Sequence, residues 1–210
     1  MKTSTLLLAA LAPVILPAGA VAQKLGTYAG TATIHATEVS GKSRREYTGK
    51  VTINVPVTST GGSTMAEVDD VDKPSATATI TEFTSSKEET SKGADGKYAT
   101  LSCKLARPTE IPLNSQGSIT IDTRAKTYTV FIAMVGLKQI PLDCVHSQSG
   151  AHKRQEGIGL SIATHDPSST PKALAYTDPA RLAAKHKLTI NGSGGATTTL
   201  EQEWDFQLRR

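Results

Sequence analysis

Five histidines are the side chains of this sequence best suited to acid–base or metal chemistry: His35, His146, His152, His165 and His186. A zinc site needs several His or Cys ligands at short spacings, and a catalytic histidine needs a nucleophile and an orienting acid. His146 and His152 share a polar segment, but their spacing matches no metal-binding pattern. Asp166 follows His165 directly, which does not define a triad. We expect His146 and His152 to be solvated loop residues, and we predict neither a metal ion nor a cofactor.

Nucleophilic catalysis needs a serine, threonine or cysteine beside a base, and the candidates here are weak. Residues 159–163 read GLSIA, so that Ala163 stands where the Gly-x-Ser-x-Gly motif requires glycine. Ser161 also has the phase of a polar residue in the middle of a strand. Cys144 is a poor nucleophile candidate because Cys103 offers it a disulfide partner. We identify no catalytic residue, and the sequence favours a non-enzymatic protein over an enzyme.

Two further segments have the composition of binding loops without the required spacing. The first is acidic and comprises Glu67, Asp69, Asp70 and Asp72. It lacks the glycine and the distant glutamate of an EF-hand, which favours a solvated turn over a calcium site. The second, residues 191–195, reads NGSGG and joins two predicted strands, so it is not a phosphate-binding loop. Asn191 is a glycosylation site only if the host is eukaryotic.

Trp204 is the one residue with two serious interpretations. It could fill the core of the last strand, or it could stack against a ligand in a pocket. Its spacing from Leu200, Phe206 and Leu208 is even throughout, which places all four side chains on one face of a strand. This shared phase favours the core position over ligand stacking.

Residues 1–22 have the pattern of a secretory signal peptide. Lys2 gives a positive start, and the apolar run that follows is too short to span a bilayer. Ala20 and Ala22 form an Ala-x-Ala cleavage site, so we expect the mature chain to begin at Gln23 or Val21. An uncleaved membrane anchor is the alternative. The sequence therefore predicts a secreted or periplasmic protein without a transmembrane segment after cleavage.

The two cysteines, Cys103 and Cys144, both take the apolar phase of a predicted strand. Cysteines of exported proteins are commonly oxidised, and we expect these two to form a disulfide bond. Closing the loop between them would restrict the unfolded chain by up to roughly 4 kcal/mol. Two buried free thiols are the alternative.

The charge pattern argues against nucleic acid as a partner. The 23 Lys and Arg residues are interspersed with 19 Asp and Glu residues, and the net charge is only +4. Aromatic residues make up 4% of the chain, which is too few for base-stacking platforms. The most basic segment, residues 147–156, contains His152, Lys153 and Arg154 but no aromatic residue. We predict that it does not bind nucleic acid specifically.

Apolar and polar residues alternate with a period of two through most of the chain after residue 25. Residues 117–122 and 127–136 show this pattern most clearly, and a short polar segment joins them as in a β-hairpin. Residues 26–57 and 188–208 predict two more hairpins. Pro141 interrupts the run at 140–144, so we expect an edge strand or a bulge there. Segments 85–97 and 146–156 carry no alternation and are predicted to be loops.

One segment has a helix start signal. Asp178 is a good N-cap, Pro179 suits the first helical position, and the alanine-rich run ends with basic residues at Lys187. The sequence thus predicts an all-β fold, an antiparallel sandwich or barrel of about 8–10 strands, with one short helix near Pro179–Lys187. Residues 23–210 form a single domain of this type. A transmembrane barrel is disfavoured because the aromatic girdles are missing.

These observations favour an exported, non-enzymatic β-domain protein that binds a small molecule, a glycan or an envelope protein. The alternatives are a secreted hydrolase whose site is assembled from loops, and a structural or adhesive surface module. The shape of the domain discriminates among these, because an open apolar mouth favours a small ligand whereas a filled interior leaves recognition at the surface.

Overall fold

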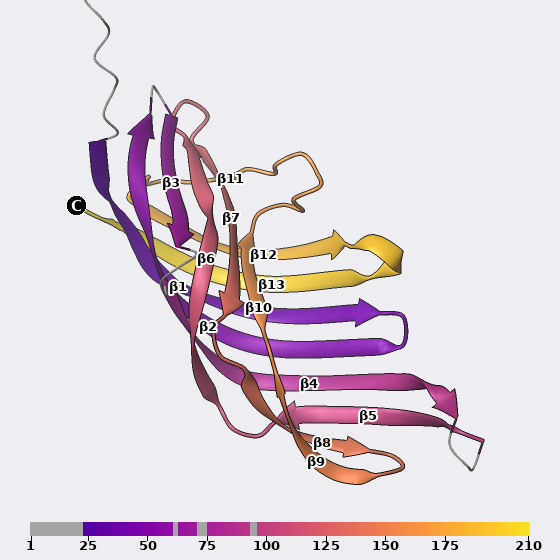
Figure 1. Cartoon of the computed structure of the whole chain (residues 1–210). Coiled ribbons are helices and arrows are strands. Elements are labelled where there is room, and N and C mark those ends of the chain that lie inside the picture. Colours follow the sequence, from indigo (N-terminus) through magenta and orange to yellow (C-terminus); the bar gives the residue numbers. More distant parts are fainter. Residues whose placement is uncertain (1–22, 61–62, 71–74, 93–95) are drawn as a thin grey trace, which may run out of the picture.

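A computed structural model describes residues 23–60, 63–70, 75–92 and 96–210 (Figure 1). The expected signal peptide, residues 1–22, lies outside the described residues, as does Asp72 of the acidic segment. The strands pair antiparallel throughout in a 13-stranded sheet, which confirms the all-β antiparallel prediction. In chain order, the strands are β1 (Gln23–Ser40), β2 (Ser43–Thr60), β3 (Ser63–Asp70), β4 (Ala76–Lys92), β5 (Tyr98–Leu105), β6 (Thr109–Asp122), β7 (Thr127–Gly136), β8 (Ile140–His146), β9 (Gly150–Glu156), β10 (Gly159–Ala163), β11 (Leu174–Ala175), β12 (Arg181–Asn191) and β13 (Thr197–Arg209).

The sheet has more strands than the 8–10 expected from the sequence. Residues 85–92 continue β4, and residues 150–156 form β9, although both segments were predicted to be loops. Six of the seven residues of β9 are exposed, and most of the far end of β4 is not buried either. A strand that buries neither face has no reason to alternate, so its sequence lacks the period-two signal.

Strand β2 divides the sheet into two layers because it has two neighbours on one side. Residues 43–53 of β2 pair with β4, and residues 57–60 pair with β3. The first layer runs β12-β13-β1-β2-β4-β5-β8-β9, and the second contains β3, β6, β7 and β10, with β11 beside β7. In Figure 1 the second layer crosses the first at a steep angle, and β1 and β2 bend from one layer into the other. This is the arrangement of an orthogonal sandwich.

Two glycines allow the strands to pack closely within these layers. A Cβ on Gly30 of β1 would overlap the Asp205 carbonyl oxygen and lie 2.8 Å from Cα of Phe206. A Cβ on Gly117 of β6 would meet β7 in the same way, 2.8 Å from Cα of Ile132. Only glycine is compatible with backbone packing this tight, and Gly117 also has a positive φ of 141°.

The space between the layers is filled by side chains. The largest fully buried ones include Trp204, Tyr28, Tyr128, Phe83, Phe206 and Ile34. Trp204 is 2% exposed, and its Nε1–H donates to the hydroxyl of Tyr128 at 3.3 Å. The core position expected for Trp204 is therefore confirmed, and its indole is not available for ligand stacking.

A buried glutamine fixes the last strand to the other layer. Gln202 is 2% exposed and occupies the apolar face of β13, between Leu200 and Trp204. Its Oε1 accepts the N–H of Ala163 at 2.9 Å, and its Nε2–H donates to the carbonyl of the same residue at 3.1 Å. Both polar atoms are thus satisfied, as burial requires, and the end of β10 is held against β13.

The prolines of the sheet lie where a neighbouring strand ends. Pro141 was expected in an edge or bulged strand, but β8 lies between β5 and β9. The register between β5 and β8 stops at Leu105 and Leu142, so Pro141 does not need to donate to β5. Pro56 of β2 similarly lies between the segment that pairs with β4 and the one that pairs with β3. A proline can therefore occupy an interior strand at such a gap.

The helix expected near Pro179–Lys187 is a strand, and this prediction is wrong. The Asp178 side chain does accept a hydrogen bond from the backbone N–H of Ala180, at 2.8 Å. The backbone carbonyl of Asp178 also accepts the N–H of Arg181, so the two bonds close a turn and do not start a helix. From Arg181 onward the chain pairs with β13 over eleven residues. A helix of two to three turns has little stability of its own, so this pairing prevails. The even spacing of Leu182, Ala184, Leu188 and Ile190 was the sequence signal for the strand.

Tyr47 connects the two layers by polar contacts. Its hydroxyl contacts the Glu38 carboxylate at 2.9 Å and the carbonyl oxygen of Gly159 at 2.9 Å. Arg45 extends this group, with ion pairs to Glu38 at 3.3 Å and to Glu156 at 3.1 Å. Burial, together with the charge of Glu38, raises the pKa of Tyr47 well above its ordinary value of 10.0. Ionising Tyr47 would therefore weaken the contact between β2 and β10.

Substituting Gly30 tests the close packing of β1 and β13. Gly30→Ala should lower the free energy of unfolding by about 1–3 kcal/mol because the new methyl group overlaps the β13 backbone. Gly157→Ala is the matched control, since no atom lies within 4 Å of its Cβ position. Urea unfolding monitored by Trp204 fluorescence measures the free energy of unfolding of both variants. Equal stability of the two variants would contradict the packing argument.

The raised tyrosine pKa values predict a loss of stability at alkaline pH. Burial raises the pKa of Tyr28 to about 12, and that of Tyr47 is also raised. Above pH 10 the unfolded chain releases these protons while the folded protein retains them, so stability falls as pH rises beyond 10. In Tyr47→Phe the decline should be shallower, although stability at pH 7 should be lower because the contact with Gly159 is lost. Urea midpoints between pH 7 and pH 11 provide the measurement, and an identical slope in the variant would contradict the assignment.

Candidate functional site

A hydrogen-bonded row crosses three strands on the face of the first layer that points away from the core. The Thr48 hydroxyl donates to Oε2 of Glu82 at 2.9 Å. Its oxygen lies 3.0 Å from Nδ1 of His35, so the ring must donate there, because the Thr48 proton is already used. The three residues are cross-strand neighbours in β1, β2 and β4. This arrangement fixes the His35 tautomer and leaves Nε2 as an acceptor.

This row opens into a hollow of about 390 Å³. The hollow is lined by His35, Glu46, Tyr47, Thr48, Thr81, Glu82, Phe83, Thr84, Lys104 and Leu105. The rings of Tyr47 and Phe83 are buried on the core side, so the hollow offers a ligand polar and charged groups without an aromatic surface. Sequence reasoning missed it because its residues come from four strands and form no motif along the chain.

Two more hollows continue the first across β5, β8 and β9. One of about 530 Å³ includes Lys104, Asp143, Val145, Ala151 and Lys153, and the next, also about 530 Å³, shares Asp143 and Lys153 with it. We call the three together the outer groove. Its residues are those lining the three hollows, from His35 on β1 to Gln155 on β9.

Charge changes sign along the outer groove. The end over β2 and β4 carries Glu46 and Glu82, whereas the far end carries Lys153 and Arg154 of β9 together with Arg107. Asp143 lies in cross-strand register between Lys104 and Lys153. Close to these charges, Val145 exposes 58% of its surface although it is a large apolar residue. An apolar centre with a charged rim is typical of protein–protein contact surfaces.

The disulfide bond joins Cys103 and Cys144 beneath the outer groove, as expected. The two residues are direct cross-strand partners in β5 and β8. Both are buried, and neither is a free thiol. The bond therefore fastens the β8–β9 hairpin to the rest of the first layer.

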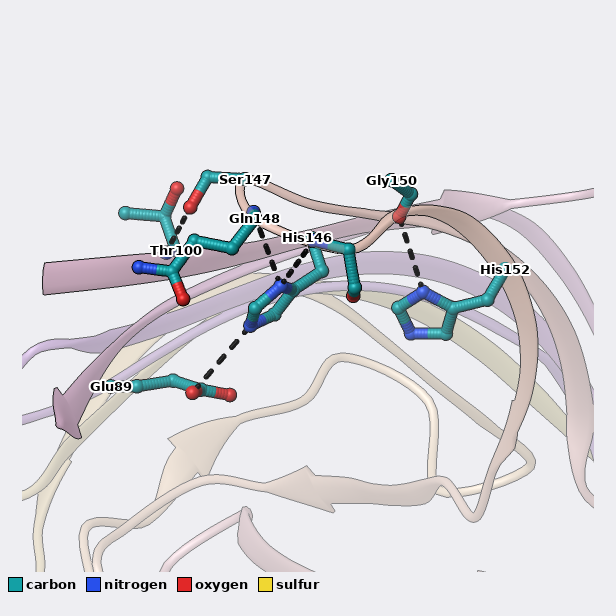
Figure 2. Close-up of polar contacts among 8 residues, drawn as sticks. Glu89, Thr100, His146, Ser147, Gln148, Gly150 and His152 are labelled. Carbon is teal, nitrogen blue, oxygen red and sulfur yellow. Dashed lines mark hydrogen bonds and ion pairs between the residues drawn. The ribbon is translucent and has the colours of Figure 1, made fainter. Parts of the chain in front are cut away.

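The ring of His146 is held by contacts at both of its nitrogens. Figure 2 shows its ring beneath the turn that joins β8 and β9, where Nδ1 accepts the backbone N–H groups of Gln148 at 3.3 Å and Ser149 at 3.1 Å. The proton must then lie on Nε2, which faces Glu89 at 3.5 Å. With both ring nitrogens engaged, His146 stabilises the turn. His146 was expected in a solvated loop, but it ends β8 and is only partly exposed.

His152 and His186 differ in exposure. His152 is exposed, as expected, though it lies in β9 rather than in a loop, and its Nδ1–H donates weakly to the carbonyl of Gly150 at 3.4 Å. His186 lies on the inner face of β12, edge-on to Trp204. Burial, with a smaller contribution from Lys172, lowers the pKa of His186, which therefore favours the neutral form. Neither histidine has a nucleophile as a hydrogen-bond partner among the described residues.

The remaining candidates are not drawn together. Ser161 pairs with Ala133 in the middle of β10, and Asn191 ends β12 before the glycine turn. Glu67 is an exposed residue of β3. In the ranges that the structure describes, no three His, Cys, Asp or Glu side chains are placed to hold a metal ion.

No family model, curated protein or solved structure matches this chain. Within the described part of the chain, no helix is long and apolar enough to cross a membrane.

Removing the disulfide should destabilise the protein. Replacing both cysteines by alanine should lower the free energy of unfolding by about 2–5 kcal/mol. It should also speed hydrogen exchange in β8 and β9 more than in β13, because the hairpin loses its covalent link. The matched control is Ser102→Ala with Val145→Ala, the cross-strand pair next to the bridge on the opposite face. Uniform exchange rates in both variants would contradict the proposed anchoring role.

Proposed function

We propose that this protein is an exported, non-enzymatic binding protein that recognises an envelope protein through the outer groove. The observation that carries the proposal is the contrast between the filled space between the layers and the groove across six strands of the outer face. Among the described residues the space between the layers is filled by buried side chains such as Trp204 and Phe206, which favours recognition at the surface. The pattern of residues 1–22 and the disulfide support the exported location.

A protein fits the outer groove better than a small molecule or a glycan does. Pockets for small molecules enclose the ligand, whereas the three hollows of the outer groove are open, and the first presents Glu46, Glu82 and Lys104. The groove also lacks an exposed aromatic ring on which a sugar could stack, since Tyr47 and Phe83 are buried. Exposed Val145 amid charged residues matches the composition of a protein contact.

Two histidine–hydroxyl contacts among the described residues bear on the hydrolase alternative. His165 Nδ1 lies 3.2 Å from Oγ1 of Thr164, but Thr164 is fully buried and its hydroxyl donates to the carbonyl of Val130. The other contact involves the oriented ring of His35 in the outer groove. In a nucleophile–base pair the hydroxyl donates to the histidine, but here His35 donates to Thr48, and Thr48 donates to Glu82. The proton therefore lies on the wrong atom for His35 to activate Thr48. His35 instead orders the polar surface of the groove.

Photo-crosslinking in the envelope of the source organism tests the proposal. A photoreactive residue at Thr84 or Ser102, within the groove, should give a discrete protein adduct that mass spectrometry can identify. The same residue at Thr189 or Gln207, on the exposed face of β12 and β13, should give none. Lys104→Glu should reduce the adduct formed at Thr84. Equal adducts at all four positions, or none at the groove positions, would contradict recognition through the groove.

A second measurement distinguishes the binding proposal from the hydrolase alternative. The purified protein should release no chromophore from p-nitrophenyl esters or glycosides above the rate seen with His35→Ala. Turnover that depends on His35 would replace the binding proposal by a catalytic one.

A further inference from the structure

Strand β9 ends the first layer at one edge of the sheet. Among the described residues it pairs with β8 alone, so one side of its backbone has no partner strand. Residues 150–155 are exposed on both faces of the strand. An unpaired edge of this kind is able to accept an extended peptide as an additional strand.

This edge is held in a fixed position before any partner arrives. The disulfide between Cys103 and Cys144 fastens β8 to β5, and Cys144 is the cross-strand partner of His152 in β9. Glu156 at the end of β9 also forms an ion pair with Arg45 of β2 at 3.1 Å. A strand with a fixed backbone loses little entropy on binding, which favours peptide addition.

The charges of β9 are unbalanced, in contrast to those of β12 at the opposite edge. On β12, each of three cations has an acid on β13: Arg181 with Asp205, Lys185 with Glu203 and Lys187 with Glu201. On β9, Lys153 faces Asp143 and Arg154 faces Leu142 in the strand register. The ion pairs of the described residues include neither Lys153 nor Arg154.

The charges of Lys153 and Arg154 also determine which kind of strand can pair with β9. A second copy of this chain that paired through β9 would bring Lys153 and Arg154 against their own equivalents, and pairing through β12 would bring them near Lys185 and Lys187. Like charges on opposing strands are destabilising, whereas opposite charges are favourable. The free edge therefore disfavours self-association and favours an acidic strand.

We propose that β9 binds an extended acidic segment of a partner protein, which adds to the sheet as its next strand. This inference rests on the proposed function and specifies the partner of the outer groove, since Lys153 lines two of its three hollows. Backbone hydrogen bonds to β9 supply binding that is independent of sequence. Glutamate or aspartate side chains at alternate positions contact Lys153 on one face or Arg154 on the other.

Binding of synthetic peptides to the full mature protein tests this proposal. The probe is a peptide that alternates Glu and Val and matches the seven residues of β9 in length. One control has the same charge but contains prolines at its central positions, which prevents strand pairing. A second control alternates Lys and Val. Amide chemical shifts in NMR titrations report both the dissociation constant and the location of binding.

The acidic peptide should shift and protect the amides of β9 and bind at least about tenfold more tightly than either control peptide. The double variant Lys153→Glu with Arg154→Glu should bind the acidic peptide about tenfold or more weakly than the unmodified protein does, and it should bind the Lys–Val peptide more tightly. The matched control, Arg124→Glu with Lys138→Glu, changes the net charge equally at exposed sites outside the groove and should leave binding within about twofold.

Three results would overturn the proposal. If the proline-containing peptide bound as tightly as the acidic strand peptide, the interaction would be non-specific charge attraction and not strand pairing. Shifts confined to other strands would place the site elsewhere, and tighter binding of an oligothymidine than of the acidic peptide would identify a nucleic-acid surface. Because the crosslinking experiment scores Thr84 and Ser102 independently, it can succeed while peptide binding fails, so the two proposals are tested separately.

Discussion

The divided pairing of β2 is the constraint on which the architecture depends. One strand cannot serve two neighbours on the same side unless the sheet bends between them, and the bend creates the two layers. The core then forms where the layers face each other, with Trp204, Tyr128 and Phe206 between them. Gly30 and Gly117 are necessary because a side chain at either position would separate paired strands. The outer groove is a consequence, since it lies on the side of the first layer that the second layer does not cover.

The sequence predicted the parts of the fold in which one face of a strand is buried. The hairpin of β6 and β7, the pairing of β1 with β2 and the phase of Trp204 all follow from period-two alternation, and the structure confirms them. The disulfide was expected for the same reason, because Cys103 and Cys144 take the apolar phase. These features are local, and their physical cause is visible in a few neighbouring residues.

The errors arose where local signals compete with distant pairing. Asp178 and Pro179 start a helix as well as they start a turn, and only the partner strand β13 decides between the two. Strand β9 and the end of β4 carry no apolar pattern because they contribute little to the core. The outer groove could not be predicted at all, since His35, Thr48 and Glu82 become neighbours only through the register of three strands. No spacing along the chain records such a register.

The bridge between β5 and β8 also determines how the protein would respond to mechanical force. A force applied to an edge strand breaks its hydrogen bonds to the sheet one after another, and the neighbouring strand can then be detached in the same way. Here a pull on β9 can detach β9 itself, but β8 remains attached to β5 by a covalent bond. A pull on the edge can therefore separate β9 from its neighbour, while β8 stays joined to β5 as long as the disulfide is oxidised.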